Sequence, residues 1–184
     1  MGNINNWKKV KLGDVCIVKR GSSPRPIEKF ITKDKNGINW IKIGDTSLNS
    51  KYIIHTAQKI IPEGMNKSCF VQAGDFLLSN SMSFGRPYIL KIDGCIHDGW
   101  LVLKDNKNLF NKIFLYYYLS SPSVYNRFKH MAVGGVVNNL NSEMVKKLDL
   151  PLASPDEQKR IADILDKATE LIALRKQQIK KLDL

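Results

Sequence analysis

Three short polar segments of the chain combine serine, asparagine and basic side chains with the glycine and proline residues of rigid loops. Arginine and asparagine can each form two hydrogen bonds with the edge of one base, and lysine and arginine also bind phosphates. The segments are therefore candidate contacts to double-stranded DNA, although each alone is also typical of an ordinary turn. The candidate residues are Lys19, Arg20, Ser22, Ser23 and Arg25 in the first segment, Ser79, Asn80, Ser81, Ser83 and Arg86 in the second, and Asn138 and Asn139 in the third.

The charge of the chain also favours a polyanionic partner. Its 29 lysine and arginine residues outnumber its 17 aspartate and glutamate residues, which gives a net charge of +12. Residues 1–53 carry 11 basic against 4 acidic residues, whereas residues 151–184 carry 7 against 6. The excess thus lies in the globular part and not in the tail. From charge alone, a lysine-rich surface without a ligand is the alternative.

The sequence contains no motif that indicates catalysis. It has no glycine-rich phosphate loop, and it has no Pro-Pro pair of the kind that adenine methyltransferases need. His97 and Asp98 could form half of a catalytic pair, but no serine or cysteine stands in a nucleophile-elbow context. A turn-forming aspartate is the favoured interpretation. The acidic residues at 156–157 near Lys159 are interpreted as helix-capping residues and not as ligands of a nuclease metal. We expect no catalytic residues.

Metal binding and membrane insertion are not indicated either. The three cysteines and three histidines show no ligand-type spacing. No apolar run approaches the roughly eighteen residues that a membrane-spanning helix needs, and the first residues lack the apolar core of a signal peptide. We therefore expect a cytoplasmic protein without a metal site and without a membrane partner.

From residue 7 to about residue 150, short runs of β-forming residues alternate with turn residues. Residues 110–119 place aromatic and aliphatic side chains at helical spacing, and a second short helix is expected from Ser123. Residues 148–152 are predicted to form a strand or an extended segment that closes the domain. These elements predict an α+β fold, with a compact and mostly antiparallel domain over residues 1–152. The predicted strands are residues 15–18, 40–43, 76–79, 87–90 and 100–103.

A long helix is predicted for residues 153–184. Ser154, Pro155 and Glu157 form a helix-start signal with a capping box. About 30 helical residues would extend about 45 Å, so part of the helix must project and its apolar seam needs a partner helix. The missing C-cap indicates a natural short form or a cut within a longer helix, and a helix folded back on its own core is the alternative. The seam residues are Ile161, Leu165, Ala168, Ile172, Ile179 and Leu182, with Arg175 as a charged interruption.

This pattern resembles the specificity subunits of type I restriction-modification systems over nearly the whole chain. The resemblance is carried by residues 7–15 (WKKVKLGDV), by the first polar segment, and by residues 40–45 (WIKIGD) and 74–79 (GDFLLS). The most specific part is residues 150–162 (LPLASPDEQKRIA), which join the last apolar strand to the helix through a proline and a Glu-Gln pair.

The resemblance implies a subunit with two recognition domains, each reading half of a split DNA target, held apart by two long antiparallel helices. It also implies partner modification subunits that methylate adenine with S-adenosylmethionine, and a restriction subunit that cleaves DNA with ATP and Mg. No cofactor is then expected in this chain. The second recognition half would come from a second copy or from a missing C-terminal half. Recognition residues vary within the family, so the resemblance assigns no base contact.

Two other functions are possible from the sequence. An assembly adaptor would use the helix seam to dock a methyltransferase partner and would have only generic DNA affinity. A nuclease or another enzyme would need a metal or cofactor site that the residue pattern does not provide.

Overall fold

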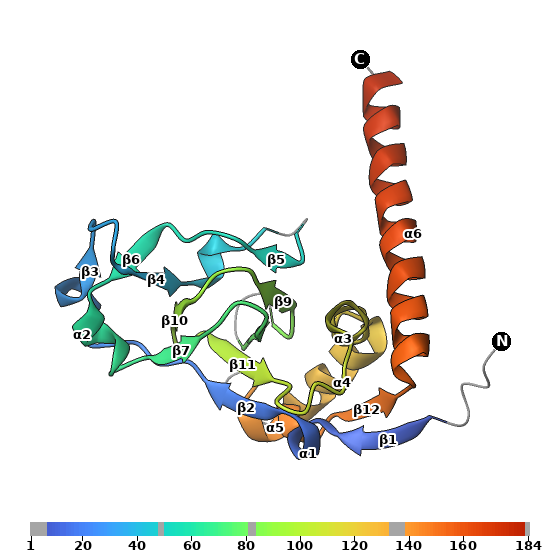
Figure 1. The fold of residues 1–184 in the computed structure, drawn as a ribbon, viewed down its shortest axis with the longest axis horizontal. Coiled ribbons are helices and arrows are strands. Elements are labelled where there is room, and N and C mark those ends of the chain that lie inside the picture. The colour runs from blue at the N-terminus through green and yellow to red at the C-terminus, as the bar shows by residue number, and fades with distance from the viewer. Residues whose placement is uncertain (1–6, 48–49, 81–83, 133–138, 183–184) are drawn as a thin grey trace.

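The computed structural model describes residues 7–47, 50–80, 84–132 and 139–182, which form a globular part and one long projecting helix (Figure 1). The strands are β1 (Lys8–Lys11), β2 (Ile17–Arg20), β3 (Ile31–Thr32), β4 (Ile38–Ile41), β5 (Tyr52–Ile53), β6 (Gln58–Ile60), β7 (Cys69–Val71), β8 (Phe76–Ser79), β9 (Pro87–Leu90), β10 (Gly94–Ile96), β11 (Trp100–Lys104) and β12 (Asp149–Leu152). The α-helices are α1 (Leu12–Val15), α2 (Pro62–Met65), α3 (Lys112–Leu119), α4 (Pro122–Ala132), α5 (Ser142–Lys146) and α6 (Pro155–Leu182), and two 3₁₀ turns cover Ile27–Lys29 and Ile43–Asp45.

The described strands form two five-stranded sheets and one two-stranded sheet. The sheets have the orders β3-β6-β4-β10-β7, β2-β11-β8-β9-β5 and β1-β12. Only the β10/β4 and β5/β9 pairs among them are parallel. The predicted α+β class with a mostly antiparallel arrangement is confirmed.

The central strands of the second sheet are buried on both faces. Leu101 and Leu103 of β11 pack with the helices in the largest core cluster. Trp100 and Val102, which alternate with them, pack in a second cluster that includes Ile41 of the other sheet. Because side chains alternate across a strand, β11 connects the helix layer to the layer between the two sheets.

The predictions for strands 76–79 and 87–90 match β8 and β9, and the helix predicted at 110–119 is α3. This helix begins only at Lys112, because the Asn111 side chain accepts hydrogen bonds from the backbone N–H groups of Ile113 at 2.9 Å and Phe114 at 3.1 Å. The strand predicted at 15–18 is wrong at its start. A single turn of helix, α1, precedes β2 and places Leu12 in the core.

The start of α6 is fixed by the Glu-Gln pair. The backbone N–H of Glu157 donates to the Ser154 hydroxyl at 3.3 Å, as predicted for a cap, but the Glu157 carboxylate accepts from the Trp7 indole at 3.0 Å. Gln158 is 1% exposed. Its Nε2 donates to the carbonyl oxygens of Leu109 and Ala153, and its Oε1 accepts from the backbone N–H of Asn111. Both side chains thus anchor the helix to the globular part.

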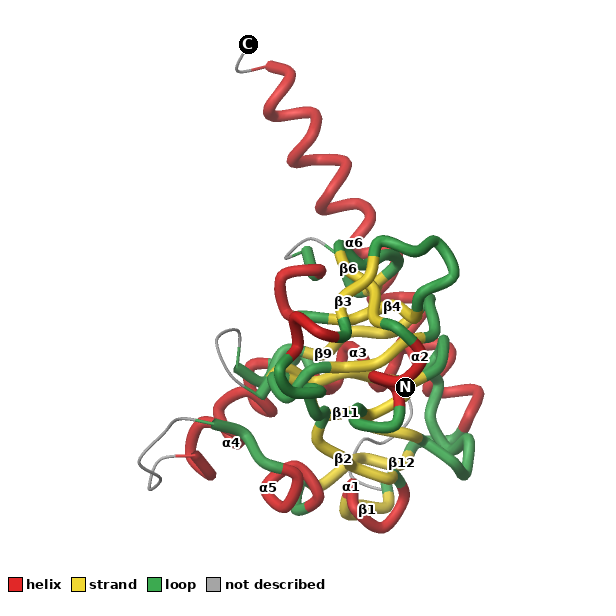
Figure 2. The backbone as a smooth tube through the Cα atoms, turned by 90° about the vertical axis from the view of Figure 1, so that its left-hand side faces the viewer, coloured by secondary structure: helices red, strands yellow, loops and turns green. Residues whose placement is uncertain are grey.

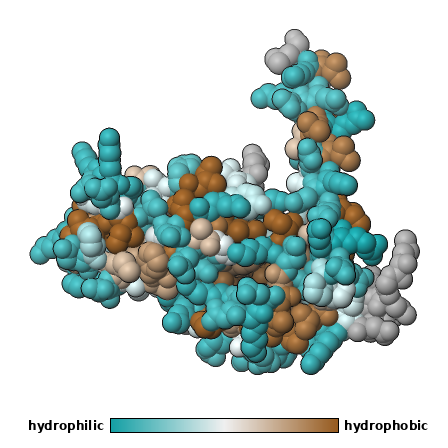
Figure 3. Space-filling view, viewed as in Figure 1, coloured by the Kyte–Doolittle hydropathy of each residue, from teal (hydrophilic) through white to brown (hydrophobic). Residues whose placement is uncertain are grey.

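Beyond its first turns, α6 leaves the globular part. Ala162 is buried, whereas every residue from Lys167 to Leu182 is exposed. Figure 2 shows the helix rising away from the strands, and Figure 3 shows hydrophobic residues on its projecting part. The prediction of a projecting helix is confirmed, and the alternative of a helix folded back on its core is wrong. Within the described ranges, no helix is long and apolar enough to cross a membrane.

Candidate nucleic-acid interface

The turn between β10 and β11 holds the first predicted polar segment in place. Asp98 lies in this turn, which is closed by a hydrogen bond from Trp100 N to His97 O at 3.2 Å. The Ser23 hydroxyl donates to Asp98 Oδ1 at 2.9 Å, and Arg25 Nη2 lies 3.6 Å from Asp98 Oδ2. Arg20 Nε donates to the backbone carbonyl of Asp98 at 3.1 Å. We call this set of contacts the Asp98 junction.

The second and third predicted segments join the same junction through Asn80. The Asn80 side-chain amide donates to Asp98 O at 2.8 Å, and its backbone N–H donates to Gly99 O at 3.0 Å. The backbone carbonyl of Asn80 accepts from Leu140 N at 3.0 Å. The first two segments therefore meet at this turn, and Leu140, next to Asn139 of the third segment, contacts the second segment at Asn80.

Close backbone packing supports the junction at Gly21. A Cβ atom added to Gly21 would lie 2.1 Å from the backbone oxygen of His97. No side chain fits at this distance, so glycine lets the first segment lie directly against the β10–β11 turn.

Of the first segment, Lys19, Arg20, Ser22 and Arg25 are exposed, and the Arg25 side chain is 82% exposed. Ser23 is half-buried because its hydroxyl faces Asp98. The segment thus presents three cations at the surface.

The second and third segments are placed differently from the prediction. Ser79 and Asn80 are 0% and 1% exposed. Buried side chains cannot contact a base edge. These two residues therefore have a structural role, which corrects that part of the prediction. Ser81, Ser83 and Asn138 lie outside the described residues, and Asn139 is half-buried.

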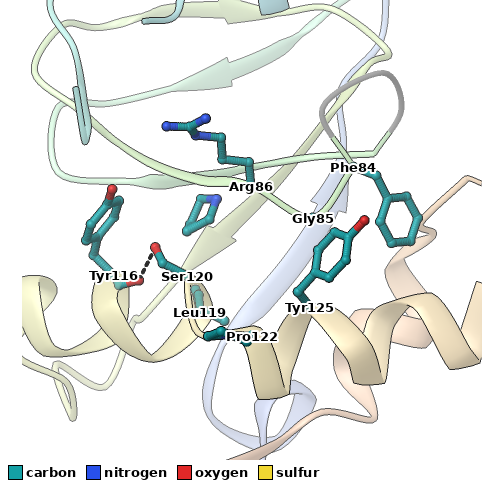
Figure 4. A pocket seen from close by; sticks show the side chains of 9 residues that line it. Phe84, Gly85, Arg86, Tyr116, Leu119, Ser120, Pro122 and Tyr125 are labelled. Carbon is teal, nitrogen blue, oxygen red and sulfur yellow. Dashed lines mark hydrogen bonds between the residues drawn. The ribbon is translucent and has the colours of Figure 1, made fainter. Parts of the chain in front are cut away.

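Arg86 lines an open groove beside the second segment (Figure 4). The groove has a volume of about 620 Å³ and lies between residues 84–87 and the helices α3 and α4. The guanidinium of Arg86 lies 5.6 Å from the centre of the Tyr88 ring, a cation–π distance. Phe84 and Tyr125 meet edge to face across the groove, with ring centres 6.4 Å apart. Flat aromatic surfaces beside a cation suit a nucleic-acid contact.

The ionisation of the junction is set by its contacts. Burial alone would raise the pKa of Asp98, but the hydrogen bond from Ser23, the charge of Arg20 and, in acid where it is protonated, the charge of His97 lower the pKa overall. Burial lowers the pKa of His97 despite the neighbouring carboxylate. At neutral pH the junction therefore contains an ionised Asp98 and a neutral His97.

The junction does not have the geometry of a nucleophilic triad. The Ser23 hydroxyl donates directly to the Asp98 carboxylate, whereas a triad needs the imidazole between the two groups. Across the part of the chain that the structure describes, no three His, Cys, Asp or Glu residues come together to hold a metal ion. Burial raises the pKa of the Cys16 thiol to about 12 and that of Cys95 to about 11, so neither is a reactive thiolate at neutral pH.

Sequence reasoning missed two contributors to this surface. The sequence favours a turn-forming role for Asp98. Its contacts with Ser23, Arg20 and Asn80 join residues far apart in the sequence, so no local pattern predicts them. Lys67 lies in residues 54–100, which carry 4 basic and 4 acidic residues and so show no excess of charge. Its carbonyl accepts from the Ser22 hydroxyl at 3.3 Å, and its ammonium lies 4.9 Å from the centre of the Phe30 ring. Lys67 therefore adds an exposed cation beside the first segment.

The predicted seam residues of α6 fall into two groups. Ile161 packs against the core, and Leu165 is half-buried beside an apolar groove of about 370 Å³ that Trp7, Phe114 and Tyr118 also line. Ala168, Ile172, Ile179 and Leu182 are exposed; the exposed fractions of the last three are 56%, 57% and 84%. The seam is therefore uncovered over the projecting part of the helix.

Comparisons with known proteins agree on one family. Residues 4–184 match the family described as type I restriction modification DNA specificity domain. The type I restriction enzyme MjaIX specificity subunit of Methanocaldococcus jannaschii is 26% identical over 178 residues, which are 94% of this chain and 40% of the relative. A putative specificity subunit of Haemophilus influenzae is 28% identical over 169 residues, or 90% of this chain and 41% of the relative. The chain thus spans about 40% of the length of these curated relatives.

Solved structures share the fold. The HsdS subunit from Thermoanaerobacter tengcongensis superposes with a TM-score of 0.72 at 22% identity, covering 94% of this chain and 39% of that subunit. The type I restriction-modification S subunit from M. genitalium gives a TM-score of 0.60 at 14% identity, covering 97% of this chain and 44% of that subunit.

Proposed function

Because the chain belongs to the type I restriction-modification DNA specificity family, we propose that its globular part recognises half of a split duplex target and that α6 joins this half to partner proteins. Specificity subunits of this family are non-catalytic. The observation that carries the proposal is the Asp98 junction, where the first two segments with DNA-binding composition meet and the third adjoins Asn80.

The exposed cations at the junction supply the electrostatic part of DNA binding. Lys19, Arg20 and Arg25 extend from one short segment, and Lys67 lies beside it. Such cations bind phosphates and fix the protein on the duplex. Side chains on the neighbouring loops would read the base edges. The close packing at Gly21 would keep the first segment in one arrangement.

A salt series on duplex binding tests this proposal. We expect the full chain to bind short duplexes at low salt, with an affinity that falls steeply as salt rises. Replacing Lys19→Gln or Arg25→Gln should weaken binding and lower the slope of log affinity against log salt by about 1 for each phosphate that the protein no longer neutralises.

Lys35→Gln is the matched control for these variants, because Lys35 is equally exposed but lies in the turn between β3 and β4. It should leave both the affinity and the slope nearly unchanged. If no duplex binds at low salt, or if the control variant has the same effect as Arg25→Gln, the proposed interface is wrong.

The partners follow from the family and from the uncovered seam. We propose that α6 binds a second recognition half, supplied by a second copy or by a further part of the protein, and that modification and restriction subunits dock on the assembled protein. S-adenosylmethionine, ATP and Mg would be bound by those partners. The support in this chain is the exposed apolar side of α6 at Ile172 and Ile179.

The same exposed seam favours a second candidate, an assembly adaptor with only generic DNA affinity. Ile172→Asp combined with Ile179→Asp should abolish binding to a modification subunit, since charges on the seam cannot be buried against a partner. The globular part should keep its melting temperature. Unchanged assembly would exclude the adaptor, whereas a failure to assemble with intact, sequence-selective DNA binding would favour the first proposal.

A further inference from the structure

A polar cluster lies where α6 leaves the globular part. Lys51 Nζ lies 2.5 Å from Asp166 Oδ1, and the Tyr117 hydroxyl lies 2.7 Å from the same oxygen. The Tyr117 hydroxyl is also 3.1 Å from the backbone oxygen of Leu165 and 2.9 Å from Thr169 Oγ1. We call Lys51, Tyr117 and Asp166 the clamp.

The clamp connects three elements that are distant in the sequence. Lys51 directly precedes β5, the edge strand of the second sheet, and its backbone oxygen accepts from Ile89 N at 2.8 Å. Tyr117 lies on α3, which packs along α6, and Asp166 lies on α6 itself. The edge of the sheet, the covering helix and the projecting helix are therefore tied together at one carboxylate.

The surroundings of Lys51 make this contact stronger than an ordinary surface ion pair. Its side chain is 21% exposed, and its ammonium lies 5.4 Å from the centre of the Tyr117 ring and 5.7 Å from that of Tyr52. Partial burial against aromatic faces limits screening by solvent. Burial alone would raise the pKa of Asp166, but the hydrogen bonds from Lys51 and Tyr117 lower it overall, so the carboxylate is charged at neutral pH.

Besides the packing of Ile161 and Ala162 against the core, two polar anchors on α6 determine its direction. The first is Gln158, which is buried with three hydrogen bonds to the globular part. The second is Asp166, eight residues further along, which is about 12 Å at 1.5 Å per residue. A helix held at one anchor can pivot about it, whereas a helix held at two anchors has a fixed direction.

A small pivot would matter at the far end of the helix. From Gln158, about which the helix would pivot, to Lys180 the helix extends about 33 Å, so a tilt of about 7° would move that end by about 4 Å. The rise per base pair of duplex DNA is about 3.4 Å. A tilt of this size would therefore change the distance between two DNA-reading halves by about one base pair.

We propose that Lys51, Tyr117 and Asp166 are positioning residues that fix the direction of α6 and so set the spacing between the recognition surface and a partner half bound on the helix. The role in spacing rests on the proposed function, whereas the role in fixing the helix does not. Loss of the clamp should leave the globular part folded and should allow α6 to pivot about Gln158.

Spin-label distance measurements on the full chain test the clamp without DNA or partners. One label is attached at Lys33→Cys in the globular part and the other at Lys180→Cys on α6, both exposed positions, in a Cys69→Ser background. We expect Lys51→Met and Tyr117→Phe each to shift or broaden the distance distribution by about 4 Å or more, with little change in melting temperature.

Lys91→Met is the matched control, because Lys91 is exposed and its ammonium lies 4.6 Å from the centre of the Tyr52 ring, yet it belongs to the β9–β10 connection and not to the clamp. It should leave the distribution unchanged. If Lys51→Met lowers the melting temperature strongly, Asp166→Asn provides the same test from the helix side of the clamp.

A distribution with the same mean distance and the same width as before the substitution, in both Tyr117→Phe and Asp166→Asn, would overturn the clamp. A failure of duplex binding in the salt series would instead count against the proposed function and leave this result standing. With the modification subunit added, the clamp variants should also methylate targets of altered spacing, which the Lys91→Met control should not do.

Discussion

The Asp98 junction is held by polar contacts between residues far apart in the sequence, whereas α6 is built from hydrogen bonds within one segment and leaves its apolar side chains exposed. At the junction, Arg20, Ser23 and Asn80 all donate hydrogen bonds to one aspartate. On α6, Ile172 and Ile179 have no cover from the described globular part. The first region is closed by its own contacts, whereas the apolar side of the second is left uncovered by the described residues.

This difference separates the two tasks that the protein would perform. A preorganised loop surface can distinguish base sequences, because it need not be ordered at the moment of binding. A regular helix can hold two parts at a fixed separation, because its length is set by 1.5 Å per residue.

The largest effect is expected from Gln158→Leu, which disconnects the two regions. The change leaves the backbone groups of Leu109, Asn111 and Ala153 without their buried partner, and we expect a loss of unfolding free energy on the order of 3 kcal/mol. Urea denaturation measures it. Gln177→Leu, on an exposed position of the same helix, is the control and should change stability by less than about 0.5 kcal/mol.

A smaller effect is expected from Gly21→Ala, which pushes the first segment away from the β10–β11 turn. The added Cβ would lie 2.1 Å from the backbone oxygen of His97, and overpacking of this kind costs about 1–3 kcal/mol. Duplex affinity should fall together with stability, because the cations of the segment move. Gly44→Ala, where an added Cβ meets nothing within 4 Å, should be silent in both measurements. Equal effects of the two variants would show that the junction is not tightly packed.

The local sequence patterns of these regions explain how much of the fold can be predicted. The helix α6 has a strong local signal, a capping serine followed by spaced apolar residues. The strands β8 and β9 have another, runs of β-forming residues between glycines. All three elements are therefore predicted. Composition also singles out three polar segments, and the structure brings described parts of all three together.

What the sequence could not supply was the direction of individual side chains. Ser79 and Asn80 are of the residue types that read bases, but Ser79 ends the buried strand β8 and Asn80 directly follows it, and both side chains are buried. The strands β3 and β5 contain only two residues each, which is too short for a pattern to show. The clamp joins Lys51 to Asp166 across 115 positions, and nothing near either residue indicates the other.

The smallest effect is expected from Asp98→Asn, which keeps the shape of the junction and removes its charge. The pKa of Asp98 is lowered in the folded protein, so the carboxylate contributes stability above its unfolded pKa near 3.8, and this contribution is lost as pH falls through the lower folded value. The unfolding free energy of the unmodified protein should therefore exceed that of the variant at pH 7, and the difference should shrink toward zero in acid. A difference that is constant with pH would show that the charge does not matter.

The most direct test of the account is hydrogen–deuterium exchange of the full chain with and without a duplex that contains its target. We expect the duplex to slow exchange in residues 19–25, 84–86 and 139–141, and to leave the exposed residues 171–182 of α6 unchanged. Protection of α6 or of the turn between β3 and β4, with the Asp98 junction unaffected, would contradict the division between a surface that reads DNA and a helix that holds partners.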